Sequence, residues 1–123
     1  MNSSLNPPPH SRLTIIQRLV ASYKLWQDFL RHFPKASRYT LGEKIDNLFI
    51  EVLELVFIAS YLPKNSKTPS IEKAIVKLDL IKFFLQITWE TRATKTSQYA
   101  ALSERLDEIG RMLRGWARQS SLK

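Results

Sequence analysis

The sequence predicts an all-α protein, built as an antiparallel up-down bundle of four helices. Apolar residues recur at steps of three and four in four segments, and breaks rich in proline and polar residues separate these segments. No segment keeps the alternation of period two that is typical of strands. With 123 residues, 44% of them hydrophobic, the chain is long enough for one domain with its own core. Because the breaks are short, neighbouring helices should be antiparallel.

The chain divides into an arm, a bundle and a tail. We expect residues 1–11 to be a flexible arm, because Pro7–Pro9 lack amide donors and disfavour helix in the residue before each of them. Residues 12–119 should form the bundle, and residues 120–123 a short basic tail.

The first helix is expected from Leu13 to His32, where the following Pro34 prevents its continuation. Its apolar residues lie three and four apart, which places them on one stripe. They are Ile16, Leu19, Val20, Tyr23, Trp26 and Leu30.

The second helix is expected from Thr40 to Tyr61, before Pro63. Thr40 and Glu43 have the spacing of a capping box, in which the Thr40 hydroxyl accepts from the Glu43 amide and the Glu43 carboxylate accepts from the Thr40 amide. Losing such a cap costs about 1 kcal/mol.

The third helix is expected to begin at Pro69, with Thr68 as its N-cap. Proline is tolerated at the first helical position because the amide there has no partner within the helix. The helix should continue to Thr91 or Arg92, and a short polar loop should lead to a fourth helix over residues 97–118.

The second and third helices are apolar on more than one face. In the second, Ile50, Leu53 and Phe57 form a stripe beside the main one, and the third adds Leu80 and Phe83 outside its main stripe. A helix in a bundle of four normally buries one stripe. The extra faces predict contacts with other copies of the chain. The alternative is that both helices are central in a wide core.

The composition indicates an acidic partner. The formal net charge is +8, from 19 basic and 11 acidic residues. Such a charge attracts polyanions, and nucleic acid is the commonest of them; an anionic membrane surface and a solvated surface without a polyanion are the alternatives. The absence of cysteine fits the cytoplasm. We expect no export segment and no membrane span, because the most apolar stretch contains Glu51 and Glu54 and is shorter than the ~20 residues that a span needs.

Basic residues gather on the third and fourth helices and on the loop between them. At 100° per residue, three arginines of the fourth helix fall within about 60° of one another. The planar guanidinium can bind phosphate at two points, although a row of charges on a helix is also found on simple solvated faces. The candidates for phosphate contacts are Arg111, Arg114 and Arg118 on the fourth helix, Lys73 and Lys77 on the third, and Arg92 and Lys95 around the loop.

No pattern in the sequence predicts catalysis. His10 and His32 are the only imidazoles, cysteine is absent, and the three glycines do not form a phosphate-binding loop. We therefore expect no enzyme activity, no catalytic residues, no metal and no cofactor.

Two segments resemble the accessory variability determinant (Avd) family of bacterial diversity-generating retroelements. One begins at Phe33-Pro34, continues through Arg38-Tyr39-Thr40-Leu41-Gly42 and includes the apolar helix that follows; the other is Asp107-Glu108-Ile109-Gly110-Arg111-Met112-Leu113, ending at Gly115-Trp116. Relatives usually read Gly-Gly before this tryptophan, where this chain has Arg114-Gly115.

The resemblance implies a four-helix protomer that assembles into a five-fold, ring-like homo-oligomer. It implies binding to the retroelement reverse transcriptase and to nucleic acid, the template RNA or its cDNA, in support of mutagenic retrohoming. One alternative is the related family of four-helix proteins encoded in intervening sequences of ribosomal RNA genes. Another is a helical protein-interaction module without a nucleic-acid role.

Overall fold

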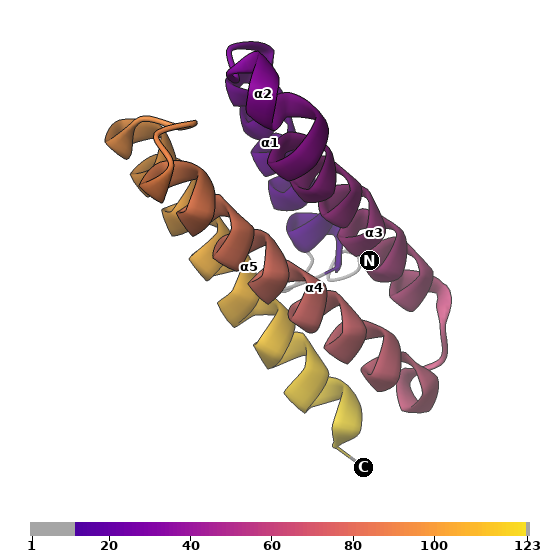
Figure 1. Cartoon of the computed structure of the whole chain (residues 1–123). Helices are drawn as coiled ribbons and strands as arrows, with labels where there is room; N and C mark the ends of the chain where they lie inside the picture. The colour runs from indigo at the N-terminus through magenta and orange to yellow at the C-terminus, as the bar shows by residue number, and fades with distance from the viewer. Residues whose placement is uncertain (1–11, 123) are drawn as a thin grey trace.

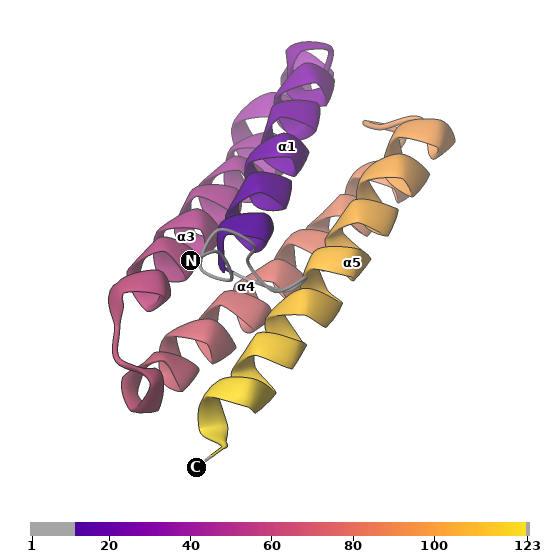
Figure 2. The same ribbon diagram turned by 180° about the vertical axis from the view of Figure 1, so that it is seen from behind.

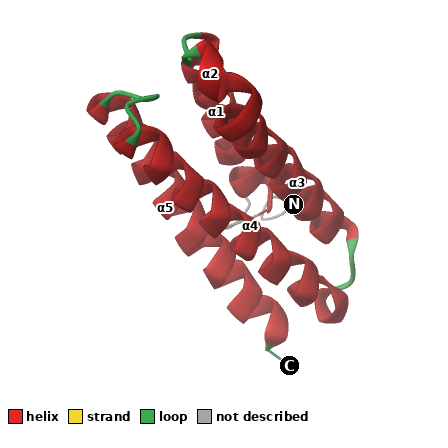
Figure 3. Cartoon of the chain, in the orientation of Figure 1, coloured by secondary structure: helices red, strands yellow, loops and turns green. Residues whose placement is uncertain are grey.

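The computed structural model describes residues 12–122, and all regular structure in this part of the chain is helical (Figure 3). Its long helices are α1 (Arg12–Arg31), α3 (Glu43–Tyr61), α4 (Lys64–Glu90) and α5 (Thr96–Ser121). The prediction of an all-α protein with four helices is confirmed. The expected proline-rich arm, residues 1–11, and the last residue of the expected basic tail lie outside the described residues.

The four long helices enclose one apolar core. α4 packs against α3 on one side and α5 on the other, and α1 contacts both α3 and α5 (Figures 1 and 2). Each helix contributes large side chains that are fully buried, among them Trp26, Phe49, Leu78 and Leu106. Burial of this kind is the main favourable contribution to folding.

The buried face of α1 is rotated slightly from the predicted stripe. Ile15 and Phe29, which the predicted stripe omits, are buried together with Leu19 and Trp26, whereas Val20 is exposed. The inclusion of Val20 in the core was therefore wrong. Steps of three and four fit both stripes, and the neighbours α3 and α5 decide which one is covered.

The predicted capping box at Thr40 is also wrong. Residues 35–61 are helical throughout, as a short α2 (Lys35–Ser37), a π-helical turn η2 (Arg38–Gly42) and then α3. The helical stretch begins after Pro34, whose carbonyl accepts from the amides of residues 37 and 38 at 3.0 and 3.1 Å. Thr40 therefore lies inside a helical turn, where its hydroxyl donates to the Ser37 carbonyl at 3.3 Å instead of capping α3.

The start of α4 differs from the prediction by about one turn. Pro63, in an extended conformation, is the N-cap, and Pro69 lies inside the helix. Thr68 is therefore not the N-cap. The first turn closes without Pro69, because the Ser66 amide donates to the Pro63 carbonyl at 2.9 Å. Next to the internal proline, the Ser70 hydroxyl donates to the Leu55 carbonyl of α3 at 3.1 Å and joins the two helices.

A polar cluster joins α1 to α3 at the edge of the core. Asp46 accepts from the Trp26 indole at 3.2 Å and from the Gln27 amide at 2.6 Å. Gln27 also donates to the Tyr23 hydroxyl at 3.0 Å. Burial, and then the hydrogen bond with Asp46, raise the pKa of Tyr23 above its ordinary value. The cluster satisfies the one polar atom of Trp26, a side chain that is otherwise fully buried.

Candidate nucleic-acid interface

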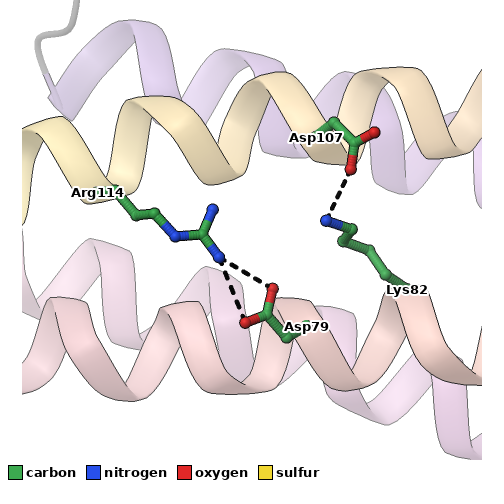
Figure 4. Close-up of polar contacts among 4 residues, drawn as sticks. All are labelled: Asp79, Lys82, Asp107 and Arg114. Carbon is green, nitrogen blue, oxygen red and sulfur yellow. Dashed lines mark hydrogen bonds and ion pairs between the residues drawn. The ribbon is translucent and has the colours of Figure 1, made fainter.

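Ion pairs between helices occupy part of the basic surface. Two of them cross between α4 and α5: Lys82 to Asp107 at 2.7 Å, and Arg114 to Asp79 at 3.3 Å (Figure 4). Two others join Arg18 of α1 to α5 and Lys77 of α4 to α3, and a fifth pair joins Arg31 to Asp28 within α1. All are partly exposed, so each contributes little to stability. Each of the five cations therefore already has a carboxylate partner; they are Arg18, Arg31, Lys77, Lys82 and Arg114.

The structure separates the seven predicted phosphate contacts into paired and unpaired residues. Arg114 is turned toward Asp79, and Lys77 binds Glu51 at 2.8 Å. The remaining candidates are exposed and form no ion pair with any described residue. They are Lys73, Arg92, Lys95, Arg111 and Arg118.

The unpaired candidates do not form one patch. Arg111 and Arg118 lie on α5, whereas Arg92 and Lys95 lie in the turn before it. At 1.5 Å per residue, Arg111 is about 24 Å along the helix from Lys95. Lys73 lies on α4. The charge of these candidates is therefore divided among the outer face of α5, the turn between α4 and α5, and α4 itself.

The turn between α4 and α5 has a fixed conformation. The Ala93 amide donates to the Thr88 carbonyl at 2.7 Å, and the Arg92 amide donates to the Trp89 carbonyl at 3.0 Å. This is a Schellman ending, in which the residue after the cap is left-handed and usually glycine. Here that residue is Arg92, with φ of 65°. The buried hydroxyls of Thr88 and Thr94, 3.0 Å apart, hold the turn from inside.

Two hollows open beside this turn, and Arg92 and Lys95 line both of them. The first has a volume of about 510 Å³ and is also lined by Trp89 and Glu90. The second, about 470 Å³, lies between the turn and the end of α1, where His32 contributes to its wall. The arrangement places two cations between two spaces large enough for small ligands.

Trp89 forms a fixed aromatic wall of the first hollow. Its ring stacks on Tyr99 of α5 with centroids 5.1 Å apart and an angle of 10° between the ring planes. Its indole nitrogen donates to the Thr96 hydroxyl at 3.0 Å. The side chain keeps 39% of its surface exposed. The sequence analysis did not select Trp89, because its spacing also fits the apolar stripe of α4. The available signal was a tryptophan next to two cations at a helix end.

A second candidate surface is apolar and lies on the outer sides of α3 and α4. On α4, Leu80 and Phe83 are 38% and 56% exposed, and Val76 continues the same stripe. On α3, Phe57 and Tyr61 are exposed, and their rings contact each other. Four residues of the expected extra faces are exposed in the protomer, whereas Leu53 is partly buried against the core; the exposed ones are Ile50, Phe57, Leu80 and Phe83. The alternative of a wide core that buries both faces is wrong at these four positions.

Comparison with known proteins identifies a family. A family model described as bAvd-like matches residues 13–120. The match covers all four long helices almost completely, together with the seven predicted contact residues and both hollows. No curated protein sequence matches the chain. No helix in residues 12–122 is long and apolar enough to cross a membrane.

Proposed function

Because the chain belongs to the bAvd-like family, we propose that it is an accessory protein of a diversity-generating retroelement. In this role it binds the reverse transcriptase of the element, together with template RNA or cDNA, in the cytoplasm and supports mutagenic retrohoming. The reverse transcriptase carries out the chemistry, and this chain contributes no catalytic residue, metal or cofactor. The family match carries the proposal, and it favours this role over that of the proteins from ribosomal RNA intervening sequences.

The charge distribution supports the nucleic-acid part of the proposal. The net charge is +8, and Arg111 and Arg118 are exposed on α5 without an ion-pair partner among the described residues. Unpaired arginines on the outside of a helix can bind phosphates without breaking an existing contact. Binding of this kind depends strongly on salt and weakly on sequence.

The apolar outer face supports the oligomeric part. We propose that the protomer is an antiparallel up-down bundle and that the outer sides of α3 and α4 pack against neighbouring copies in a ring, a pentamer in the resemblance drawn above. Exposed apolar surface that includes aromatic residues, here Phe57, Tyr61 and Phe83, is typical of such contacts. Burial of Phe83 between copies would remove its apolar surface from water.

A binding experiment with matched charge changes tests the nucleic-acid role. We expect the double variant Arg111→Ala, Arg118→Ala to bind RNA at least tenfold more weakly at low salt, and its affinity to vary less with salt than that of the wild type. The control is the double variant Lys77→Ala, Arg114→Ala, which also removes two positive charges, but ones that Glu51 and Asp79 already compensate. Equal and small effects of the two changes in a salt-controlled gel shift would remove α5 from the interface. A wild-type chain that binds no RNA would favour the protein-interaction module.

A further inference from the structure

The turn between α4 and α5 holds two cations in a defined place. Arg92 is fixed in the left-handed conformation by the two hydrogen bonds of the Schellman ending, and the Lys95 amide donates to the Gln98 side chain at 2.9 Å. Their backbones are therefore ordered before any ligand binds. Neither side chain forms an ion pair with a described residue. Since both line both hollows, an anion between the two hollows would contact both cations.

The aromatic wall next to these cations is ready to stack a base. Tyr99 covers one side of the Trp89 ring and Thr96 fixes the indole nitrogen, yet Trp89 remains partly exposed and lines the first hollow. The rotamer entropy of this side chain is thus already lost in the free protein. Base stacking on an aromatic side chain contributes about 1–3 kcal/mol per base and tolerates any sequence.

We propose that this end of the molecule is a binding site for single-stranded nucleic acid. One base stacks on Trp89 in the first hollow, the adjoining phosphate lies between Arg92 and Lys95, and the strand continues into the second hollow beside His32. A duplex fits poorly, because its bases are stacked on each other and are not free to lie on a side chain. The site rests on the proposed nucleic-acid role and specifies its ligand as an unpaired strand.

Intrinsic fluorescence gives a direct test, because the three tryptophans differ in exposure. Trp26 and Trp116 are 0% and 8% exposed, against 39% for Trp89. We expect an unlabelled oligouridylate to quench the fluorescence of the wild-type chain, and a duplex RNA of the same length to quench it much less. The same two RNAs, with a fluorescent label, give the affinities by anisotropy.

Three variants distinguish nucleic-acid binding at this site from binding that depends only on the net charge of the chain. Trp89→Leu should weaken oligouridylate binding about tenfold and abolish the quenching. Arg92→Gly should weaken it severalfold and reduce the steepness of the salt dependence by about 0.7, one phosphate contact on a single strand. Since glycine suits the left-handed position, the thermal midpoint of Arg92→Gly should rise, which excludes misfolding as the cause. Lys64→Ala, an exposed charge at the far end of α4, is the control and should change affinity less than twofold.

The outcomes distinguish this site from the proposed function. If oligouridylate binds tightly without quenching, and Trp89→Leu and Arg92→Gly bind as the wild type does, the site is wrong while the nucleic-acid role stands. If duplex RNA binds as tightly as the single strand and depends equally on Trp89, the assignment to unpaired strands is wrong. If neither RNA binds the wild type, the nucleic-acid role itself fails and the site with it.

Discussion

Asp46 shows how a single carboxylate stabilises the contact between α1 and α3. It accepts from Trp26, which is fully buried, and from Gln27. Replacement of Asp46 by Ala leaves the indole N–H without an acceptor, a loss of about 1–3 kcal/mol. We expect Asp46→Ala to lower the free energy of unfolding by about 2 kcal/mol in chemical denaturation. Glu54→Ala, an exposed carboxylate on the same helix, should change it by less than about 0.5 kcal/mol, and equal effects would contradict the role of Asp46.

The Tyr23 phenol makes stability depend on pH in the alkaline range. Its pKa is raised in the folded chain, chiefly by burial, so the unfolded chain ionises first and ionisation favours unfolding. Its contribution is fully present below the ordinary pKa of tyrosine, 10.0, and is lost as pH rises through the raised pKa. The difference in free energy of unfolding between wild type and Tyr23→Phe should be constant at lower pH and should fall above that value. A difference that does not change with pH would refute this.

Arg92 occupies a position that glycine would fill with less strain. A left-handed conformation costs a residue with a side chain about 1–2 kcal/mol, and the greater freedom of glycine in the unfolded chain offsets part of the gain. We expect Arg92→Gly to raise the free energy of unfolding by about 0.5–1 kcal/mol. Arg118→Gly, within the last turns of α5, should instead lower it by up to about 1 kcal/mol. A loss of stability in both variants would show that Arg92 is not strained.

At the scale of elements, the sequence predicted the helices better than their starting points. Apolar spacing located all four long helices because each has a buried face. The rules for helix starts failed at Thr40 and Pro69. The helical stretch that includes Thr40 begins earlier, after Pro34, and both Pro63 and Pro69 are acceptable near a helix start. The first turn of α4 is polar and mostly exposed, so no apolar pattern marked it as helical.

Features of the candidate site that lie on a single helix were predictable from the sequence. Features that require contacts between two helices were not. The common face of Arg111 and Arg118 follows from helical spacing alone. The pairing of Arg114 with Asp79 depends on how α4 and α5 are aligned, which one sequence does not give. Likewise, Trp89 becomes a wall of a hollow only because Tyr99 and Thr96 of α5 fold against it.

The outer face of α4 gives a prediction about assembly. If this face contacts neighbouring copies, charges placed there must be desolvated and will oppose association. We expect the double variant Leu80→Lys, Phe83→Lys to sediment with the mass of one chain while keeping its helical circular dichroism. Val20→Lys, which places one such charge on an exposed position of α1, should keep the mass of the wild-type oligomer. A wild type that already sediments as one chain at micromolar concentration would contradict assembly through this face.

At the scale of the whole molecule, we propose three surfaces for three different contacts. The outer sides of α3 and α4 are apolar, the outer face of α5 carries unpaired arginines, and the turn before α5 combines two cations with an aromatic wall. Because these surfaces lie on different parts of the bundle, the proposed contacts with other copies and with nucleic acid do not compete for the same residues. This separation suits a protein that brings a polymerase and its template together.

The accessory role is tested most directly by co-purification with the reverse transcriptase of the retroelement in the same host. The tagged chain is co-expressed with that enzyme, treated with nuclease and washed at physiological salt, so that RNA cannot bridge the two proteins. We predict recovery of the reverse transcriptase in a fixed stoichiometry, and loss of it when an unrelated basic helical protein replaces this chain. Recovery of this chain alone would contradict the accessory role.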